Sequence, residues 1–176
     1  MPYLLDTDVL VASKRIHYHP DFCQLFWDWV DAGHGSGLFY SLDKVKDELE
    51  GGDDEDLLKQ WAKRPHLKSF FLSSKPYTAN WQRLAQWAST RNPSFTPGAL
   101  AKFLDIKSAD AWLIAYASGN PGWHVVTNEV SAPDSKKDVK LPDAAQALGV
   151  QTFPLGRILR LHARNNFTFV ADGAAP

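Results

Sequence analysis

The sequence predicts an α/β fold, specifically a three-layer domain in which a mostly parallel sheet lies between helices. Residues 3–7 and 123–127 are short apolar runs of the kind that form buried strands. Segments with helical periodicity alternate with such runs, and the connections between them are short. This alternation is typical of parallel sheets that helices cover on both faces. We expect one domain over residues 1–170 and a flexible tail over residues 171–176.

The first half of the chain begins with the strand at residues 3–7 and continues with a helix at residues 20–32. An apolar stripe at helical spacing predicts the buried face of that helix: Phe22, Leu25, Phe26, Trp29 and Val30. Ser41 is a suitable N-cap for a helix at residues 42–50. The other elements predicted here are a strand at 38–40, a glycine stop at 51–52, a helix at 54–63 and a strand at 69–72.

The second half of the chain contains the helix that matters most for function. It begins at Ser108, and residues 119–121 (GNP) end it. Residues 128–141 are polar and rich in lysine, which predicts an exposed loop. The remaining predicted elements are a helix at 76–90, a loop at 91–98, the strand at 123–127, a helix from Pro142, a strand at 150–153 and a helix at 155–165.

Composition narrows the class of protein without deciding its function. Hydrophobic residues make up 44% of the 176 residues and charged residues 22%, as in ordinary globular proteins. The formal net charge is −1, so the chain lacks the excess of Lys and Arg that many nucleic-acid-binding proteins have. This count includes the carboxylates of a metal site but not the cations bound to them, so it does not exclude a metal-dependent nuclease. A single cysteine, Cys23, and the absence of a signal-peptide pattern or a long apolar run predict a cytoplasmic protein without membrane segments.

Acidic residues follow the predicted strands or begin the helices near one edge of the sheet. Asp6 ends the first strand, Glu129 follows the strand at residues 123–127, and Asp110 lies in the first turn of its helix. Glu48 belongs to a helix that starts near the same edge. Ligand sites of parallel sheets lie at the carboxyl ends of the strands, so we expect these acids to gather there.

Gathered carboxylates repel one another unless a cation neutralises them. A site made of oxygen ligands selects hard cations, Mg²⁺ or Mn²⁺, over zinc. Such a site can activate water and stabilise charge on a phosphodiester. Each acid also has a simpler interpretation, because Asp6, Asp110 and Asp143 could cap or favour helix starts and Glu48 could be a solvated helix residue.

Four segments resemble the acidic motifs of PIN domains, which are metal-dependent ribonucleases. They are LLDTDVLV (residues 4–11), VKDELE (45–50), SADAWLIAYA (108–117) and VVTNE (125–129), and the likeness covers residues 3–153. The segment KLPDAAQALGV (residues 140–150) is similar to the uncharacterised DUF4411 branch, a PIN-like branch often found beside antitoxin-type partners.

This resemblance implies a role for each acid. The metal-binding and catalytic residues would be Asp6, Glu48, Asp110 and Glu129, with Asp143 as an alternative fourth acid or a fifth. Thr127 and Asp8 would support them, Thr127 by holding a water or a neighbouring carboxylate. The pattern departs from the commonest PIN motifs at Asp8, where Asn or Ser is frequent, and at Glu129, where Asp is usual.

The resemblance also predicts partners. The expected substrate is RNA, and the lysines and arginine that we expect to hold its phosphates are Lys14, Arg15, Lys44, Lys46, Lys136, Lys137 and Lys140. An antitoxin protein is the expected inhibitor, with a docking surface built from Trp27, Trp29, Trp81 and Trp87. The apolar helices at residues 22–30 and 77–88 permit a homodimer.

Two other functions stay open at this point. Asp6-Thr7-Asp8 mimics the nucleophile motif of haloacid-dehalogenase-type phosphatases, in which Asp6 would be the nucleophile and Asp8 the acid/base. A non-catalytic PIN-like interaction domain is the third possibility.

Overall fold

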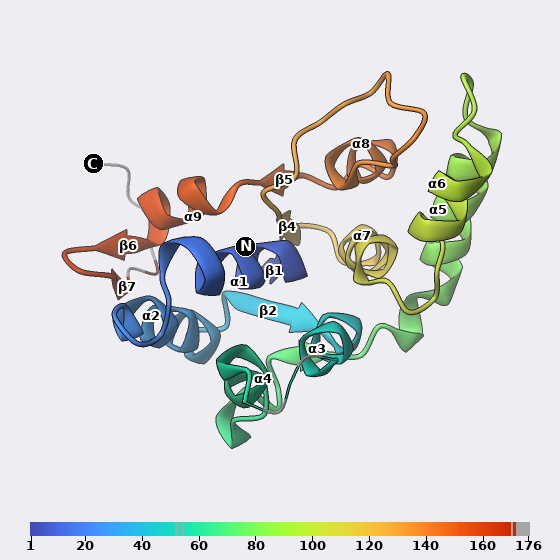
Figure 1. Cartoon of the computed structure of the whole chain (residues 1–176). Coiled ribbons are helices and arrows are strands. Elements are labelled where there is room, and N and C mark those ends of the chain that lie inside the picture. The colour runs from blue at the N-terminus through green and yellow to red at the C-terminus, as the bar shows by residue number, and fades with distance from the viewer. Residues whose placement is uncertain (52, 54, 170, 172–176) are drawn as a thin grey trace.

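The computed structural model describes residues 1–51, 53, 55–169 and 171, and within them a five-stranded parallel sheet forms the centre (Figure 1). Its strand order is β3-β2-β1-β4-β5, and each neighbouring pair is parallel. The strands are β1 (Tyr3–Leu5), β2 (Phe39–Leu42), β3 (Phe71–Leu72), β4 (His124–Val126) and β5 (Thr152–Phe153). The predicted α/β class with a parallel sheet between helices is confirmed.

A few predicted features fall where the structure gives no description. Gly52 in the predicted helix stop and Asp54 at the predicted helix start lie outside the described residues. The same holds for the predicted tail beyond Ala171.

Helices form the outer layers. Helices α2 and α9 lie on one side of the sheet, and α7 lies on the other with α5 and α6 beyond it (Figure 1). The helices are α1 (Thr7–Ala12), α2 (Gln24–Gly35), α3 (Asp43–Glu50), α4 (Leu57–Ala62), α5 (Thr78–Thr90), α6 (Pro97–Phe103), α7 (Ala109–Gly119), α8 (Leu141–Ala147) and α9 (Leu155–His162). Short turns of helix also occur at Ser13–His17, Pro65–Leu67 and Lys75–Tyr77, and a small antiparallel pair joins β6 (Ala163–Arg164) to β7 (Thr168–Phe169).

The alternation of side chains along β2 explains why both faces of the sheet are covered. Phe39 packs edge-on against Trp29 of α2, with ring centroids 4.8 Å apart. The next residue, Tyr40, faces Trp123 at 5.3 Å, and Trp123 in turn contacts Tyr116 of α7 at 5.1 Å. Successive strand residues point to opposite faces of the sheet, so the side chains of β2 pack toward both helical layers.

Several predicted element boundaries are wrong, for identifiable reasons. Ser41 is not an N-cap: it is buried in β2, and its hydroxyl donates a 2.6 Å hydrogen bond to the Leu5 carbonyl. The predicted loop at residues 91–98 ends in helix α6, because Pro97 occupies the first turn and the Thr96 side chain accepts a hydrogen bond from the Ala99 N–H. The predicted helix at residues 155–165 stops at His162, where the chain turns into β6.

The apolar face predicted for α2 is also partly wrong. The helix begins at Gln24, so Phe22 precedes it and is 74% exposed, while Leu25 is 52% exposed. Phe26, Trp29 and Val30 are buried as predicted, and Trp27, which was not in the predicted stripe, is buried as well.

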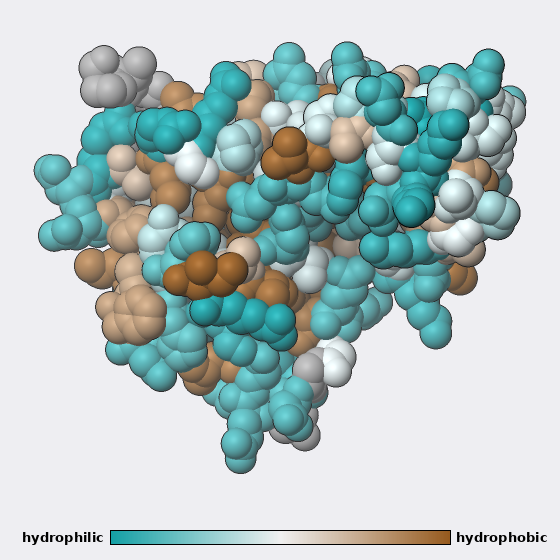
Figure 2. Space-filling view, turned by 45° about the horizontal axis from the view of Figure 1, so that its top comes forward, coloured by the Kyte–Doolittle hydropathy of each residue, from teal (hydrophilic) through white to brown (hydrophobic). Residues whose placement is uncertain are grey.

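Burial contradicts two of the four residues in the predicted tryptophan docking surface, whereas Trp81 and Trp87 are partly exposed. Trp27 and Trp29 are each 1% exposed, and their indole N–H groups donate to the Tyr18 carbonyl at 2.7 Å and the His162 carbonyl at 2.8 Å. They therefore belong to this chain's own core. Figure 2 shows mostly hydrophilic side chains on the face drawn, with hydrophobic residues in smaller groups between them. In the described part of the chain, none of the helices has the length and apolar character needed to cross a membrane.

Candidate functional site

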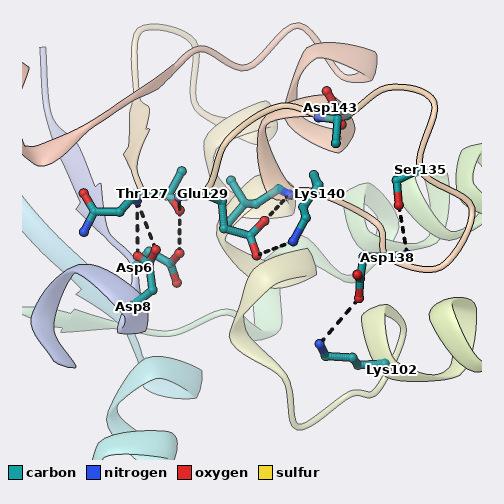
Figure 3. Close-up of polar contacts among 12 residues, drawn as sticks. Asp6, Asp8, Lys102, Thr127, Glu129, Ser135, Asp138, Lys140 and Asp143 are labelled. Carbon is teal, nitrogen blue, oxygen red and sulfur yellow. Dashed lines mark hydrogen bonds and ion pairs between the residues drawn. The ribbon is translucent and has the colours of Figure 1, made fainter. Parts of the chain in front are cut away.

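The site is built where β1 and β4 end side by side. Asp6 directly follows β1, and its N–H donates a 3.0 Å hydrogen bond to the Val126 carbonyl at the end of β4. Although Asp6 precedes α1, its side chain makes no capping bond to that helix. Its Oδ2 instead accepts a 2.9 Å hydrogen bond from the hydroxyl of Thr127 (Figure 3). Asp6 is 3% and Thr127 2% exposed, so the Asp6 carboxylate lies in the interior of the protein.

Thr127 and Asp8 organise the backbone that follows β4. The Thr127 hydroxyl, besides donating to Asp6, accepts a 3.2 Å hydrogen bond from the Glu129 N–H. Asp8, in the first turn of α1, accepts the Asn128 N–H at 3.1 Å on its Oδ2. Their predicted supporting roles therefore have a structural counterpart, since the two side chains fix the direction in which Glu129 leaves the sheet.

Thr127 provides a direct test of this arrangement. Thr127→Val keeps the side-chain volume close to the original but leaves a buried carboxylate oxygen and the Glu129 N–H without their shared partner. We expect the free energy of unfolding to fall by about 1–3 kcal/mol, measured by urea denaturation. The matched control is Thr90→Val at an exposed helix end, where the hydroxyl bonds to the Gln86 carbonyl and a loss of no more than about 0.5 kcal/mol is expected. Equal stability of Thr127→Val and wild type would show that this hydroxyl does not hold the site.

Glu48 joins three helices. It projects from α3, and its Oε1 accepts a 2.9 Å hydrogen bond from the Ala109 N–H at the start of α7. Its Oε2 accepts a hydrogen bond from the hydroxyl of Thr7 at the start of α1. Ser108, the residue before α7, makes no side-chain capping bond, so Glu48 satisfies that helix end in its place. This contact brings α7 and its first-turn residue Asp110 to the edge of the sheet.

Asp110 is the centre of the acidic cluster. Burial, followed by the negative charges of Glu129, Glu48 and Asp8, raises the pKa of its carboxyl to about 6, while the charge of Lys102 acts in the opposite direction. The acids predicted from four distant segments therefore do lie within electrostatic reach of one another. These segments meet because β1 and β4 are neighbours and Glu48 fixes α7 beside them.

The acids nearest the sheet show the same electrostatic pattern. Burial raises the pKa of Asp6 well above its ordinary value, and the charges of Asp8 and Asp110 add to this effect. The pKa of Asp8 is also raised, first by burial and then by the charge of Glu129, although the hydrogen bond from the Asn128 N–H works in the opposite direction. A cluster of this kind holds protons more tightly than isolated carboxyls do, and it favours any cation that can replace them.

Glu129 and Asp143, the two candidates for the fourth acid, lie in different surroundings (Figure 3). Glu129 Oε2 accepts a 2.8 Å hydrogen bond from the Leu141 N–H, and Lys140 Nζ lies 3.7 Å from Glu129 Oε1. The charge of Glu129 also raises the pKa of Asp110. Asp143 accepts the Ala132 N–H at 2.9 Å and the Ser131 hydroxyl, so it holds the loop that precedes α8. The structure therefore groups Glu129, rather than Asp143, with Asp6, Glu48 and Asp110.

The residues of the cluster fit a divalent cation by their donor chemistry. All of them offer carboxylate oxygens, the ligands that Mg²⁺ and Mn²⁺ prefer, and a small cavity beside Asp110 and Glu129 has a volume of about 30 Å³. That space is roughly enough for a small ion and a water. Across the described residues, however, no three His, Cys, Asp or Glu side chains stand ready to hold a metal. Side-chain rotation would therefore have to accompany binding, since Glu48, Glu129 and Asp6 already accept hydrogen bonds from the protein.

The basic residues predicted to grip RNA are placed unevenly. Lys14 is committed to a 2.6 Å ion pair with Asp56 and its side chain is 16% exposed. Lys44 lies over the ring of Trp112 at 5.9 Å, and Lys46 lies over Phe71 at 5.7 Å. The side chains predicted for the same role that extend into solvent are Arg15, Lys136 and Lys137. Lys140 lies in the acidic site itself.

Sequence reasoning missed Lys102 and Asp138. Lys102 belongs to α6, and its Nζ lies 3.9 Å from Asp138 Oδ1 at the opening of the cavity that Asp110 and Glu129 line. The sequence did contain a signal for this helix, because Thr96-Pro97 is a typical helix start. A helix predicted at residues 97–103 would have made Lys102 a candidate for the site.

The fold and the site define an α/β domain with a cluster of acids at the carboxyl edge of a parallel sheet, in which Asp6 is buried and the other acids are partly or largely exposed. The chain belongs to the family described as Domain of unknown function (DUF4411), which matches residues 3–167. Neither the curated proteins nor the solved structures give a match to the chain.

Proposed function

We propose that this chain is a metal-dependent endoribonuclease of the PIN-like type, which hydrolyses phosphodiester bonds of RNA with Mg²⁺ or Mn²⁺. The observation that supports this most directly is that Asp6, Glu48 and Glu129, from segments far apart in the sequence, lie within electrostatic reach of Asp110. Glu48 also bonds to the N–H of Ala109, the residue before Asp110. A purely structural set of acids would not need to accumulate like charges in a partly buried position, since each one raises the free energy of the others.

Within this proposal the residues divide the work. Asp6, Asp110 and Glu129 hold the cation, which when bound supplies positive charge to the phosphodiester and makes a water more acidic. Thr127 orients Asp6 through its 2.9 Å hydrogen bond. Glu48 holds the first turn of α7, and with it Asp110, through the Ala109 N–H.

Cleavage of single-stranded RNA is the experiment that tests the proposal. Open RNA can splay its backbone into a cleft, whereas duplex RNA presents a rigid surface. The purified protein should cut a short single-stranded oligonucleotide in Mg²⁺ or Mn²⁺, and EDTA should protect the substrate. No cleavage of any single-stranded or looped RNA in either metal would rule the proposal out.

We further propose that the protein is the toxin of a toxin–antitoxin pair acting in the cytoplasm. Expression alone should then slow growth by degrading RNA, and Asp6→Asn should abolish the arrest because it removes one charge from the cation site. Growth rate after induction, compared with equal amounts of wild type and variant by immunoblot, provides the measurement. If Asp6→Asn arrests growth as strongly as wild type, the toxicity does not depend on cleavage.

An inhibitor of such an enzyme would gain most by placing a guanidinium among the acids. Arginine can pair bidentately with carboxylates, and it would take the place of the cation. Co-expression of the neighbouring gene's product should restore growth. That product should also co-purify with the chain. A homodimer is compatible with this scheme, although the apolar residues Phe26, Trp29, Leu84 and Ala88 of the two helices considered for it are buried in this chain.

Two alternative functions are less well supported. A phosphatase would need Asp6 to attack phosphorus, but Asp6 is 3% exposed and its Oδ2 accepts the Thr127 hydroxyl. Trapping of a phosphoaspartate at Asp6 would favour that function. A non-catalytic interaction domain would be indicated by RNA or protein binding without metal binding or cleavage.

A further inference from the structure

A small cavity beside the acidic cluster is lined by residues of both charges. They include the acids Asp110 and Glu129 and two lysines, Lys102 of α6 and Lys140 just before α8. Lys140 lies beside Glu129, and Lys102 lies beside Asp138 (Figure 3). Asp138 lies at the same cavity. The remaining lining residues are Ala99, Phe103 and Val139. A volume of about 30 Å³ suits a small ion or one phosphate oxygen with a water, and it is too small for a nucleobase.

Both lysines of this cavity are loosely paired. Lys140 Nζ lies 3.7 Å from Glu129 Oε1, and Lys102 Nζ lies 3.9 Å from Asp138 Oδ1. Both distances exceed those of a direct hydrogen bond, roughly 2.7–3.2 Å. Ion pairs of this kind near solvent contribute little to stability, so either ammonium group can transfer to another anion at low cost.

We infer that Lys102 and Lys140 form the seat of the scissile phosphodiester, with the two ammonium groups on its non-bridging oxygens. This inference rests on the proposed ribonuclease function and deepens it by assigning the substrate's phosphate to one place. The carboxylates of the cavity repel an anion, so a phosphate would contact the two lysines.

The other basic residues do not meet these conditions. Lys14 is held by Asp56 at 2.6 Å, and Lys46, although its 3.7 Å pair with Glu50 is equally loose, does not line the cavity. Lys136 and Lys137 are exposed in the loop before α8, but they do not line the cavity. Lys102, by contrast, lines the cavity, and its charge lowers the pKa of the Asp110 carboxyl.

Asp138 should work against substrate binding. Its carboxylate competes with a phosphate for Lys102 and adds negative charge at the mouth of the cavity. Replacing it with asparagine keeps the shape and releases the lysine. The seat therefore predicts opposite changes in KM for two neighbouring substitutions, which a merely structural role for these residues would not produce.

The test measures kcat and KM for a short single-stranded RNA in Mn²⁺. Lys102→Met and Lys140→Met should each raise KM about tenfold or more with a smaller change in kcat, because a charge-assisted contact to phosphate is lost. The rise should shrink as salt increases. Asp138→Asn should lower KM severalfold. The controls are Lys68→Met, which lies before β3 at the opposite edge of the sheet, and Asp134→Asn, an exposed acid of the same loop.

The possible outcomes separate this inference from the proposed function. If wild type cleaves but the two lysine variants match Lys68→Met, with unchanged melting temperatures, the seat is wrong and the nuclease function stands. If Asp138→Asn raises KM as the lysine variants do, the three residues have a structural role and the inference also fails. A wild type that cleaves no RNA overturns the proposed function and the seat together.

Discussion

Asp110→Asn should lower the rate of RNA cleavage by about two to four orders of magnitude. Asp110 is the residue on which the charges of Glu129, Glu48 and Asp8 converge. Asparagine has the same shape but lacks the charge, so it weakens the hold on the cation without a large change in packing. Charge stabilisation by a bound metal is worth several kcal/mol, and each ~1.4 kcal/mol corresponds to a factor of ten. Single-turnover cleavage of a labelled oligonucleotide in Mn²⁺ gives the rate.

The matched control is Asp47→Asn. Asp47 is exposed on α3, next to Glu48, and the same charge is removed at a short distance from the cluster. This variant should cleave at the wild-type rate. Undiminished cleavage by Asp110→Asn would point to a contaminating nuclease, and an equal loss in both variants would indicate a general effect of net charge.

The metal-free protein should become less stable as pH rises through about 6. The folded-state pKa of Asp110 is about 6, against an ordinary value of 3.8, so between these values the folded state binds more protons than the unfolded state. The free energy of unfolding therefore falls as pH increases across this window and stays low above it. A shift of this size corresponds to up to ~3 kcal/mol, with the raised pKa of Asp6 acting in the same direction.

Asp110→Asn separates this effect from general pH sensitivity. The variant has no proton to lose at this position, so it should be more stable than wild type at pH 7.5 in EDTA and no more stable at pH 4. Urea unfolding at several pH values provides the comparison. Parallel pH profiles for the two proteins would mean that the Asp110 carboxyl is not held in the charged, buried environment described here.

Much of the fold could be predicted because its signals are local. The apolar runs at β1 and β4 and the helix that begins after Ser108 have unambiguous patterns and clear stops. The errors occurred where a local signal fits two structures. Ser41 has the chemistry of an N-cap, but its hydroxyl bonds across to β1, and the pairing of β2 with β1 cannot be read from its neighbours. Proline 97 looked like a helix breaker, although proline is favoured in the first turn of a helix.

The candidate site could be predicted in part. The rule that ligands bind at the carboxyl ends of parallel strands was enough to bring Asp6, Asp110 and Glu129 together. It could not separate Glu129 from Asp143, because that choice depends on which way the loop before α8 turns and on the bonds of Asp143 to Ser131 and Ala132. Lys102 could not be assigned, since its helix α6 was not predicted and its distance from Asp110 depends on tertiary packing.

The most direct test of the central claim is the affinity of the metal-free protein for Mn²⁺, measured by titration calorimetry in wild type and Asp6→Asn. Asp6 is the most deeply buried acid of the cluster, and its carboxylate accepts a hydrogen bond from Thr127. Loss of its charge should therefore weaken the binding of a cation by the cluster. The account predicts saturable binding to wild type and an affinity at least about tenfold lower in Asp6→Asn, with both proteins folded. Equal affinity in the two proteins, or no binding to wild type, would contradict it.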